Sequence, residues 1–69
     1  MFTYENLRRI LDERDISMRQ LSQGAGISSN CTVSLNNDRP VSIVRLAIVC
    51  NYLDIRIEDA VTVLPRDNA

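Results

Sequence analysis

The chain has 69 residues, of which 45% are hydrophobic and 25% charged, and its formal net charge is −1. A chain of this length forms about one small domain, and this composition is that of a folded globular protein, which excludes intrinsic disorder. No apolar run approaches the roughly 18 residues that cross a bilayer, and the N-terminus lacks the basic start and apolar block of a signal peptide. We therefore expect a cytoplasmic protein with no membrane partner.

The scarcity of reactive side chains limits the chemistry that this chain can perform. It has two cysteines and no histidine, too few soft ligands for a tetrahedral zinc site, so no metal or other cofactor is expected. In a reducing compartment Cys31 and Cys50 are expected to be buried thiols, with a disulfide or redox role as the alternative. Without histidine, a general acid or base would have to be a carboxylate in a cleft that so small a domain barely forms. We therefore expect no enzyme and no catalytic residues.

The charge balance counts mildly against a nucleic-acid partner. All eight basic residues are arginine, against nine acids. Residues 46–69 hold Arg56 and Arg66 against four acids, so the C-terminal third is the acidic part. Nucleic-acid-binding domains usually have a stronger basic bias than this.

Two helices are predicted at the start of the chain. Apolar residues at helical spacing predict the first helix over residues 4–14, with Thr3 as its N-cap. Ser17 and Gln20 stand three positions apart, as in a capping box, so a second helix should begin at Met18.

The chain's two glycines, Gly24 and Gly26, mark the end of this second helix. Each lowers helix propensity by about 1 kcal/mol relative to alanine, and Gly26 can adopt the left-handed conformation in which a chain leaves a helix. A phosphate-binding loop is the other use of paired glycines, but it needs a preceding strand and a fuller glycine pattern. The pattern favours a tight corner between two short helices, which is a helix-turn-helix motif.

A third helix is predicted over residues 29–36, with Ser28 as its N-cap. Three of its residues are expected to face inward: Cys31, Thr32 and Leu35. Turn-forming residues at 37–40 then break the pattern where a loop is needed.

The last third of the chain predicts two more helices. Ser42 caps a fourth helix with the most regular apolar stripe of the sequence: Ile43, Leu46, Ala47, Val49, Cys50 and Leu53. Asp54 interrupts the stripe, and apolar residues over 57–64 suggest a short fifth helix before Pro65. No segment alternates long enough to propose a strand. We expect an all-α, compact five-helix domain over residues 1–64 and a short C-terminal tail over 65–69.

Residues 18–38, MRQLSQGAGISSNCTVSLNND, resemble the helix-turn-helix of the Cro and lambda-repressor-like (XRE-type) family of bacterial and phage transcription regulators. The similarity continues through RPVSI at 39–43, and it covers roughly residues 5–64. It implies a lambda-repressor-like DNA-binding domain in which helices 2 and 3 form the motif.

Four positions depart from the family pattern. Ser22 stands where the family usually has alanine, and Thr32 replaces the usual valine or isoleucine. Asp38 and Asp54 stand where glycine often allows a left-handed backbone, a conformation that aspartate tolerates better than most residues. The first two departures concern how helices 2 and 3 pack.

The resemblance also implies how DNA is read, with the third helix in the major groove. The residues that match the family's base-reading positions are Ser29, Asn30, Val33 and Ser34. Asn30 could pair bidentately with adenine, and Val33 could contact a thymine methyl. The residues that match phosphate-contacting positions are Arg19, Ser28, Asn37 and Arg39.

Each of these assignments has a structural alternative. Ser28 can be a plain N-cap, and Asn30 and Ser34 can be solvated polar residues. The arginines Arg19 and Arg39 can pair with Asp15 or Asp38 at the surface. The third helix carries no lysine or arginine, so affinity for DNA should be modest and strongly salt-dependent.

The implied partners are operator DNA and a second copy of the chain. A two-fold dimer reads two half-sites about one helical turn apart, and we expect the dimer contact at Val61, Val63 and Leu64. The leading hypothesis is a Cro-like repressor that binds a palindromic operator, with no small-molecule ligand. The alternative is a protein-binding module on the same fold, such as an antirepressor or an antitoxin-like partner.

Overall fold

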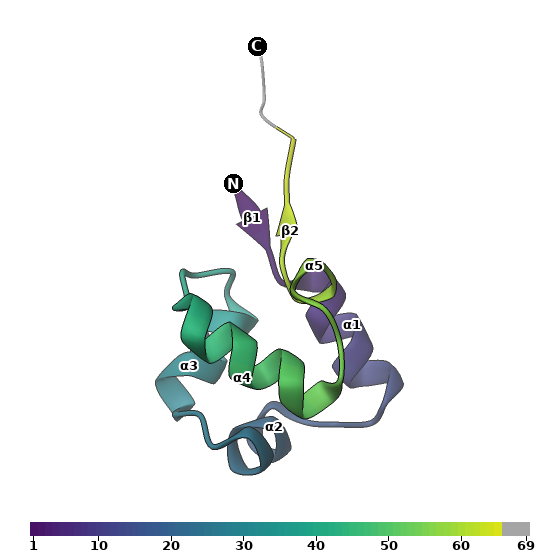
Figure 1. The fold of residues 1–69 in the computed structure, drawn as a ribbon, viewed down its shortest axis with the longest axis vertical. Coiled ribbons are helices and arrows are strands. Elements are labelled where there is room, and N and C mark those ends of the chain that lie inside the picture. Colours follow the sequence, from purple (N-terminus) through teal and green to yellow (C-terminus); the bar gives the residue numbers. More distant parts are fainter. Residues whose placement is uncertain (66–69) are drawn as a thin grey trace.

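The computed structural model describes residues 1–65, which form five helices and one short antiparallel ladder (Figure 1). In chain order the elements are β1 (Phe2–Thr3), α1 (Glu5–Glu13), α2 (Met18–Ala25), α3 (Ser29–Asn36), α4 (Ile43–Leu53), α5 (Ile57–Ala60) and β2 (Thr62–Val63). The five-helix architecture predicted from the sequence is confirmed. Within the described residues, none of the helices is long and apolar enough to cross a membrane.

A single core joins the helices, because each of the first four places a fully buried apolar side chain in it. These side chains are Leu7, Leu21, Leu35 and Val49, in α1 to α4 in turn. Burial of one such side chain stabilises a fold by about 1.5–3 kcal/mol. The core therefore fixes α3 through its inner face and leaves its outer face free.

Helix α1 begins one residue later than predicted, at Glu5, and ends at Glu13. Tyr4, at the N-cap position, is 1% exposed, and its backbone N–H donates to Asp38 instead of a partner nearby in sequence. Thr3 is consequently not the N-cap, although its hydroxyl accepts a hydrogen bond from the N–H of Glu5 at 3.2 Å. The start of α1 is set by a contact across the fold that local periodicity does not reveal.

The predicted fifth helix over 57–64 is wrong beyond its first turn. Helix α5 ends at Ala60, Val61 is extended, and β2 pairs with β1 so that Phe2 lies opposite Val63. The expectation of no strand is therefore also wrong. The β-branched residues at 61–63 favour extended backbone, and the N-terminal segment supplies the pairing partner.

The caps of α2 form as predicted. The Ser17 hydroxyl accepts from the N–H of Gln20 at 3.1 Å, and the Gln20 side chain accepts from the N–H of Ser17 at 2.8 Å. Gly26 ends the helix with φ of +74°, in the left-handed region. At Gly24 an added Cβ would meet the phenol end of Tyr52 on α4, an exposed side chain that would have to shift.

Replacing Gly26 by alanine should lower the free energy of unfolding by about 1–2 kcal/mol, the cost of a left-handed backbone for a residue with a Cβ. No heavy atom lies within 4 Å of the added Cβ, so the loss would be backbone strain alone. Gly26→Asn should lose less, because asparagine tolerates this region. Urea unfolding of the three proteins measures the differences, and equal losses for alanine and asparagine would contradict this explanation.

Helix α4 buries only part of its predicted apolar stripe. Leu46, Val49, Cys50 and Leu53 face the core, whereas Ile43 is 66% exposed and Ala47 is exposed. Val44, Ile48 and Tyr52 add to the exposed side, so this helix is apolar on both faces. As predicted, Asp38 and Asp54 adopt left-handed backbones, each with φ of +55°.

Candidate nucleic-acid interface

Helices α2 and α3 are joined by a tight turn that the Ser22 side chain helps to hold. The Ser22 carbonyl accepts from the N–H groups of both Gly26 and Ile27, at 3.0 and 3.1 Å. Its hydroxyl donates to the Ile27 carbonyl at 2.6 Å. Serine at a position where the family usually has alanine therefore adds a hydrogen bond across the turn.

The inner face of α3 is formed by Cys31, Thr32 and Leu35, as predicted. Thr32 is a polar residue in this face, and its hydroxyl donates to the Ser29 carbonyl at 2.8 Å, so the group is buried without losing its hydrogen bond. The Ser28 hydroxyl caps the helix by accepting from the N–H of Cys31 at 3.3 Å.

The structure brings the four predicted base-reading residues to the outer side of α3. Ser29 and Asn30 are exposed, Val33 is 50% exposed, and Ser34 is half-buried. Their side chains offer hydrogen-bonding groups and one aliphatic surface without any charge. Such a face can read base edges, but it cannot by itself neutralise phosphates.

The four predicted phosphate-contacting residues are all exposed, one on α2 and three at the ends of α3 or in the loop that follows it: Arg19, Ser28, Asn37 and Arg39. The side-chain nitrogen of Asn37 donates to the Val33 carbonyl at 2.8 Å, which leaves its amide oxygen and its second N–H for other partners. Neither arginine forms the surface pair considered as an alternative. The ion pairs within residues 1–65 are Arg8–Asp38 and Arg9–Glu13.

A cleft of about 300 Å³ lies between α3, the α3–α4 loop and the first turn of α4. Its lining includes both helix N-caps, Ser28 and Ser42, and the guanidinium-bearing Arg45. The Arg45 guanidinium lies 3.4 Å from the Ser42 hydroxyl. The cleft thus places a positive charge beside two helix N-termini and next to Asn30, a combination that suits an anion such as phosphate.

Arg45 is a candidate that sequence analysis missed. It lies outside the helix-turn-helix, on the first turn of α4, so the motif did not include it. The sequence did offer one indication of Arg45. A basic residue in the first turn of a helix opposes the helix dipole, where an acidic residue would be preferred, so its presence there suggests a role other than helix stability.

The two thiols are buried and unpaired, so the disulfide alternative is wrong. Burial raises the pKa of both Cys31 and Cys50, while the nearby Arg45 charge acts in the opposite direction on Cys31. Both are therefore neutral core groups. Residues 1–65 also bring no three metal-ligating side chains together.

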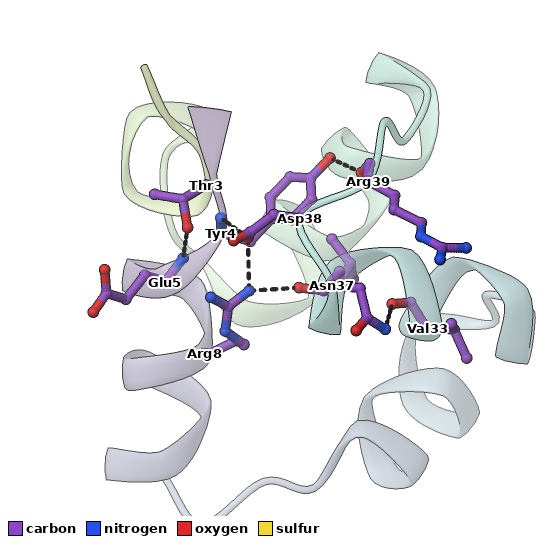
Figure 2. A network of polar contacts seen from close by, with 9 residues as sticks. Thr3, Tyr4, Glu5, Arg8, Val33, Asn37, Asp38 and Arg39 are labelled. Atoms are coloured by element: carbon purple, nitrogen blue, oxygen red, sulfur yellow. Dashed lines mark hydrogen bonds and ion pairs between the residues drawn. The ribbon is translucent and has the colours of Figure 1, made fainter. Parts of the chain in front are cut away.

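The chain that leaves α3 is tied to the N-terminal segment by a polar network, shown in Figure 2. The Asp38 carboxylate accepts from the N–H of Tyr4 and from the guanidinium of Arg8, both at 2.8 Å. Arg8 also donates to the Leu35 carbonyl at 2.9 Å, and the Tyr4 hydroxyl donates to the Arg39 carbonyl at 2.7 Å. The network joins residues some 30 positions apart in the sequence.

This network should make the free energy of unfolding depend on pH in the acidic range. Hydrogen bonds from Arg8 and from the Tyr4 N–H lower the pKa of Asp38 from 3.8 to about 2. Because the pKa is depressed in the folded state, the stabilisation is present above about pH 4 and is lost as the pH falls toward 2. Asp38→Asn should be less stable at neutral pH and lose less stability over that interval. Unfolding curves at several pH values measure this, and parallel losses in both proteins would contradict it.

Comparison with known proteins assigns a family. The family model for the Cro/C1-type HTH DNA-binding domain matches residues 6–65 of this sequence, and the chain belongs to this family. The crystal structure of the transcriptional regulator VanUg (Form II) is similar, with a TM-score of 0.86 and 28% sequence identity over 94% of this chain and 87% of that one. No curated protein matches. The chain is therefore a DNA-binding domain of a transcriptional regulator with the fold described above.

Proposed function

We propose that this protein is a Cro-like repressor of bacterial or phage origin that binds a palindromic operator as a homodimer in the cytoplasm. The observation that carries the proposal is the distribution of polar groups around α3. Its outward face is uncharged and rich in hydrogen-bonding groups, while three exposed arginines lie on neighbouring segments: Arg19 on α2, Arg39 in the α3–α4 loop and Arg45 on α4. This separation of uncharged and positively charged groups suits a sequence-specific DNA-binding protein. In such a protein, contacts with base edges specify the sequence and contacts with phosphates position the protein.

Each residue has a distinct role in this proposal. Ser29, Asn30 and Ser34 donate to or accept from base edges, and Val33 contacts a thymine methyl. Ser28 and the N–H groups of the first turn of α3 bind a phosphate, together with Arg45 across the cleft. Arg19, Asn37 and Arg39 bind neighbouring phosphates. The domain extends over residues 1–64, and the tail over 65–69 lies, except for Pro65, outside the described residues.

A protein-binding module on the same fold remains the second candidate. It is favoured by the net charge of −1 and by the exposed apolar side of α4, where Ile43 and Val44 are both 66% exposed. Salt dependence separates the two functions. If the protein binds DNA, the logarithm of its binding constant should fall linearly with the logarithm of the salt concentration. The slope should be about −0.9 for each phosphate contact. An apolar protein contact should change little.

The proposed dimer contact is the apolar end of the described chain. Val63 is 81% exposed and Leu64 is 39% exposed, while Val61 is half-buried. Val63 and Leu64 expose apolar surface at a ladder of only two strands. A two-stranded ladder is only marginally stable unless another surface packs against it.

Placing a charge on that surface should separate the subunits. Val63→Asp is expected to shift the protein to monomer in sedimentation equilibrium and to weaken operator binding by about tenfold or more, the loss that about 1.4 kcal/mol produces. Ile48→Asp, on the exposed side of α4, is the matched control and should leave the dimer intact. Dissociation by Ile48→Asp but not by Val63→Asp would move the interface to α4.

A further inference from the structure

The N-terminal part of the chain holds α3, the proposed reading helix, and the loop after it at three points: one in the last turn of α3 and two in the loop. These points are the Leu35 carbonyl, the Asp38 carboxylate and the Arg39 carbonyl, and their donors come from Tyr4 and Arg8 (Figure 2). Tyr4 is 1% exposed, so its ring and its hydroxyl are fixed by packing. The path of residues 37–39 is therefore determined by α1 and its N-cap residue Tyr4 as much as by α3.

Charge gives the Arg8–Asp38 contact a second consequence. Asp38 lies between Asn37 and Arg39, both proposed above to bind phosphates, and it is the one acid within residues 36–41. A bare carboxylate there would repel the DNA backbone. The Arg8 guanidinium lies 2.8 Å from it, with the two side chains 29% and 36% exposed, so the pair is partly shielded from solvent.

We propose that Arg8 is a positioning residue for DNA binding, which neutralises the carboxylate of the α3–α4 loop and holds that loop in its binding geometry. Nη1 of Arg8 donates to both Asp38 and Leu35, so the guanidinium is directed at the end of α3 and the α3–α4 loop. The inference rests on the proposed function, since it needs α3 and its flanking loop to face DNA. It extends the DNA-binding unit to the first helix of the chain.

The proposal is tested by charge rescue on a duplex selected by the wild-type protein. Arg8→Met exposes the Asp38 charge, and at low salt it should bind about tenfold more weakly, with a deficit that shrinks as added salt screens the repulsion. Arg8→Met combined with Asp38→Asn removes both charges and should return to within about threefold of wild type, because one unpaired charge is what costs affinity. Arg9→Met is the matched control. It removes the same charge from the exposed Arg9–Glu13 pair of α1 and should bind like wild type.

The outcomes separate this proposal from a purely structural role. If Arg8 only stabilises the fold, the double variant should bind as weakly as Arg8→Met, and the deficit should not respond to salt. If Arg8→Met is unfolded at the assay temperature, Arg8→Lys decides. It keeps the charge and should bind within about threefold of wild type, since one elementary charge is retained. A large loss in Arg8→Lys would overturn the charge argument.

Failure of this proposal is distinct from failure of the proposed function. Wild-type affinity in Arg8→Met, with a folded protein, overturns only the role of Arg8. If the wild-type protein binds no duplex at low salt, both proposals are overturned together.

Discussion

Replacing Leu35 by alanine is expected to cost about 2–5 kcal/mol of the free energy of unfolding. Leu35 is fully buried on the inner face of α3, where it joins the reading helix to the core. A domain of this size has a total stability of roughly 3–10 kcal/mol at the usual value per residue. Much of the Leu35→Ala protein should therefore be unfolded at physiological temperature, and urea unfolding followed by circular dichroism measures the loss.

Val33→Ala is the matched control for this substitution. Val33 lies on the same helix two residues earlier but is 50% exposed, so its replacement should change stability by about 0.5 kcal/mol or less. A loss of under about 1 kcal/mol for Leu35→Ala would contradict the packing of α3, since buried leucines lose at least twice that.

Asn30→Ala is expected to lose about 1–3 kcal/mol of binding free energy on the preferred duplex, a factor of about 5 to 150 in affinity. The loss should be confined to one base pair in each half-site, because an amide that pairs bidentately with one base discriminates at that position only. Asn30 is exposed, so stability should not change. Competition between duplexes that differ at single positions measures the effect.

Asn36→Ala is the control for Asn30→Ala. It removes the same amide from the other end of α3, on the side that borders α1, where no base contact is proposed. An equal loss on every duplex in Asn30→Ala would indicate a phosphate contact instead of base reading. No loss at all would remove Asn30 from the interface.

The helix-turn-helix was predictable because its signals are local. Ser17 and Gln20 form their capping box within one turn, and Gly26 ends α2 by its own backbone conformation. The inner face of α3 followed from the spacing of its apolar residues. The helices outside the motif were predicted from apolar spacing, and their lambda-repressor-like arrangement came from the family resemblance, which the match over residues 6–65 confirms.

The features that were missed depend on contacts between distant residues. The ladder between β1 and β2 joins the two ends of the described chain, and two-residue strands leave no periodic pattern. The Arg8–Asp38 ion pair and the hydrogen bond from the Tyr4 N–H to Asp38 join residues about 30 positions apart in the sequence, so neither could be inferred from residue spacing. Arg45 became a candidate only when the structure placed it beside the N-terminus of α3.

The central claim is that α3 reads a specific sequence twice, once in each subunit. Selection of bound sites from random duplex DNA by the full chain at low salt tests it most directly. The expected result is a palindrome whose half-sites lie about one helical turn apart, roughly 10 base pairs from centre to centre. If no sequence is enriched even at low salt, the outward face of α3 does not read DNA, and the fold serves contacts with another protein.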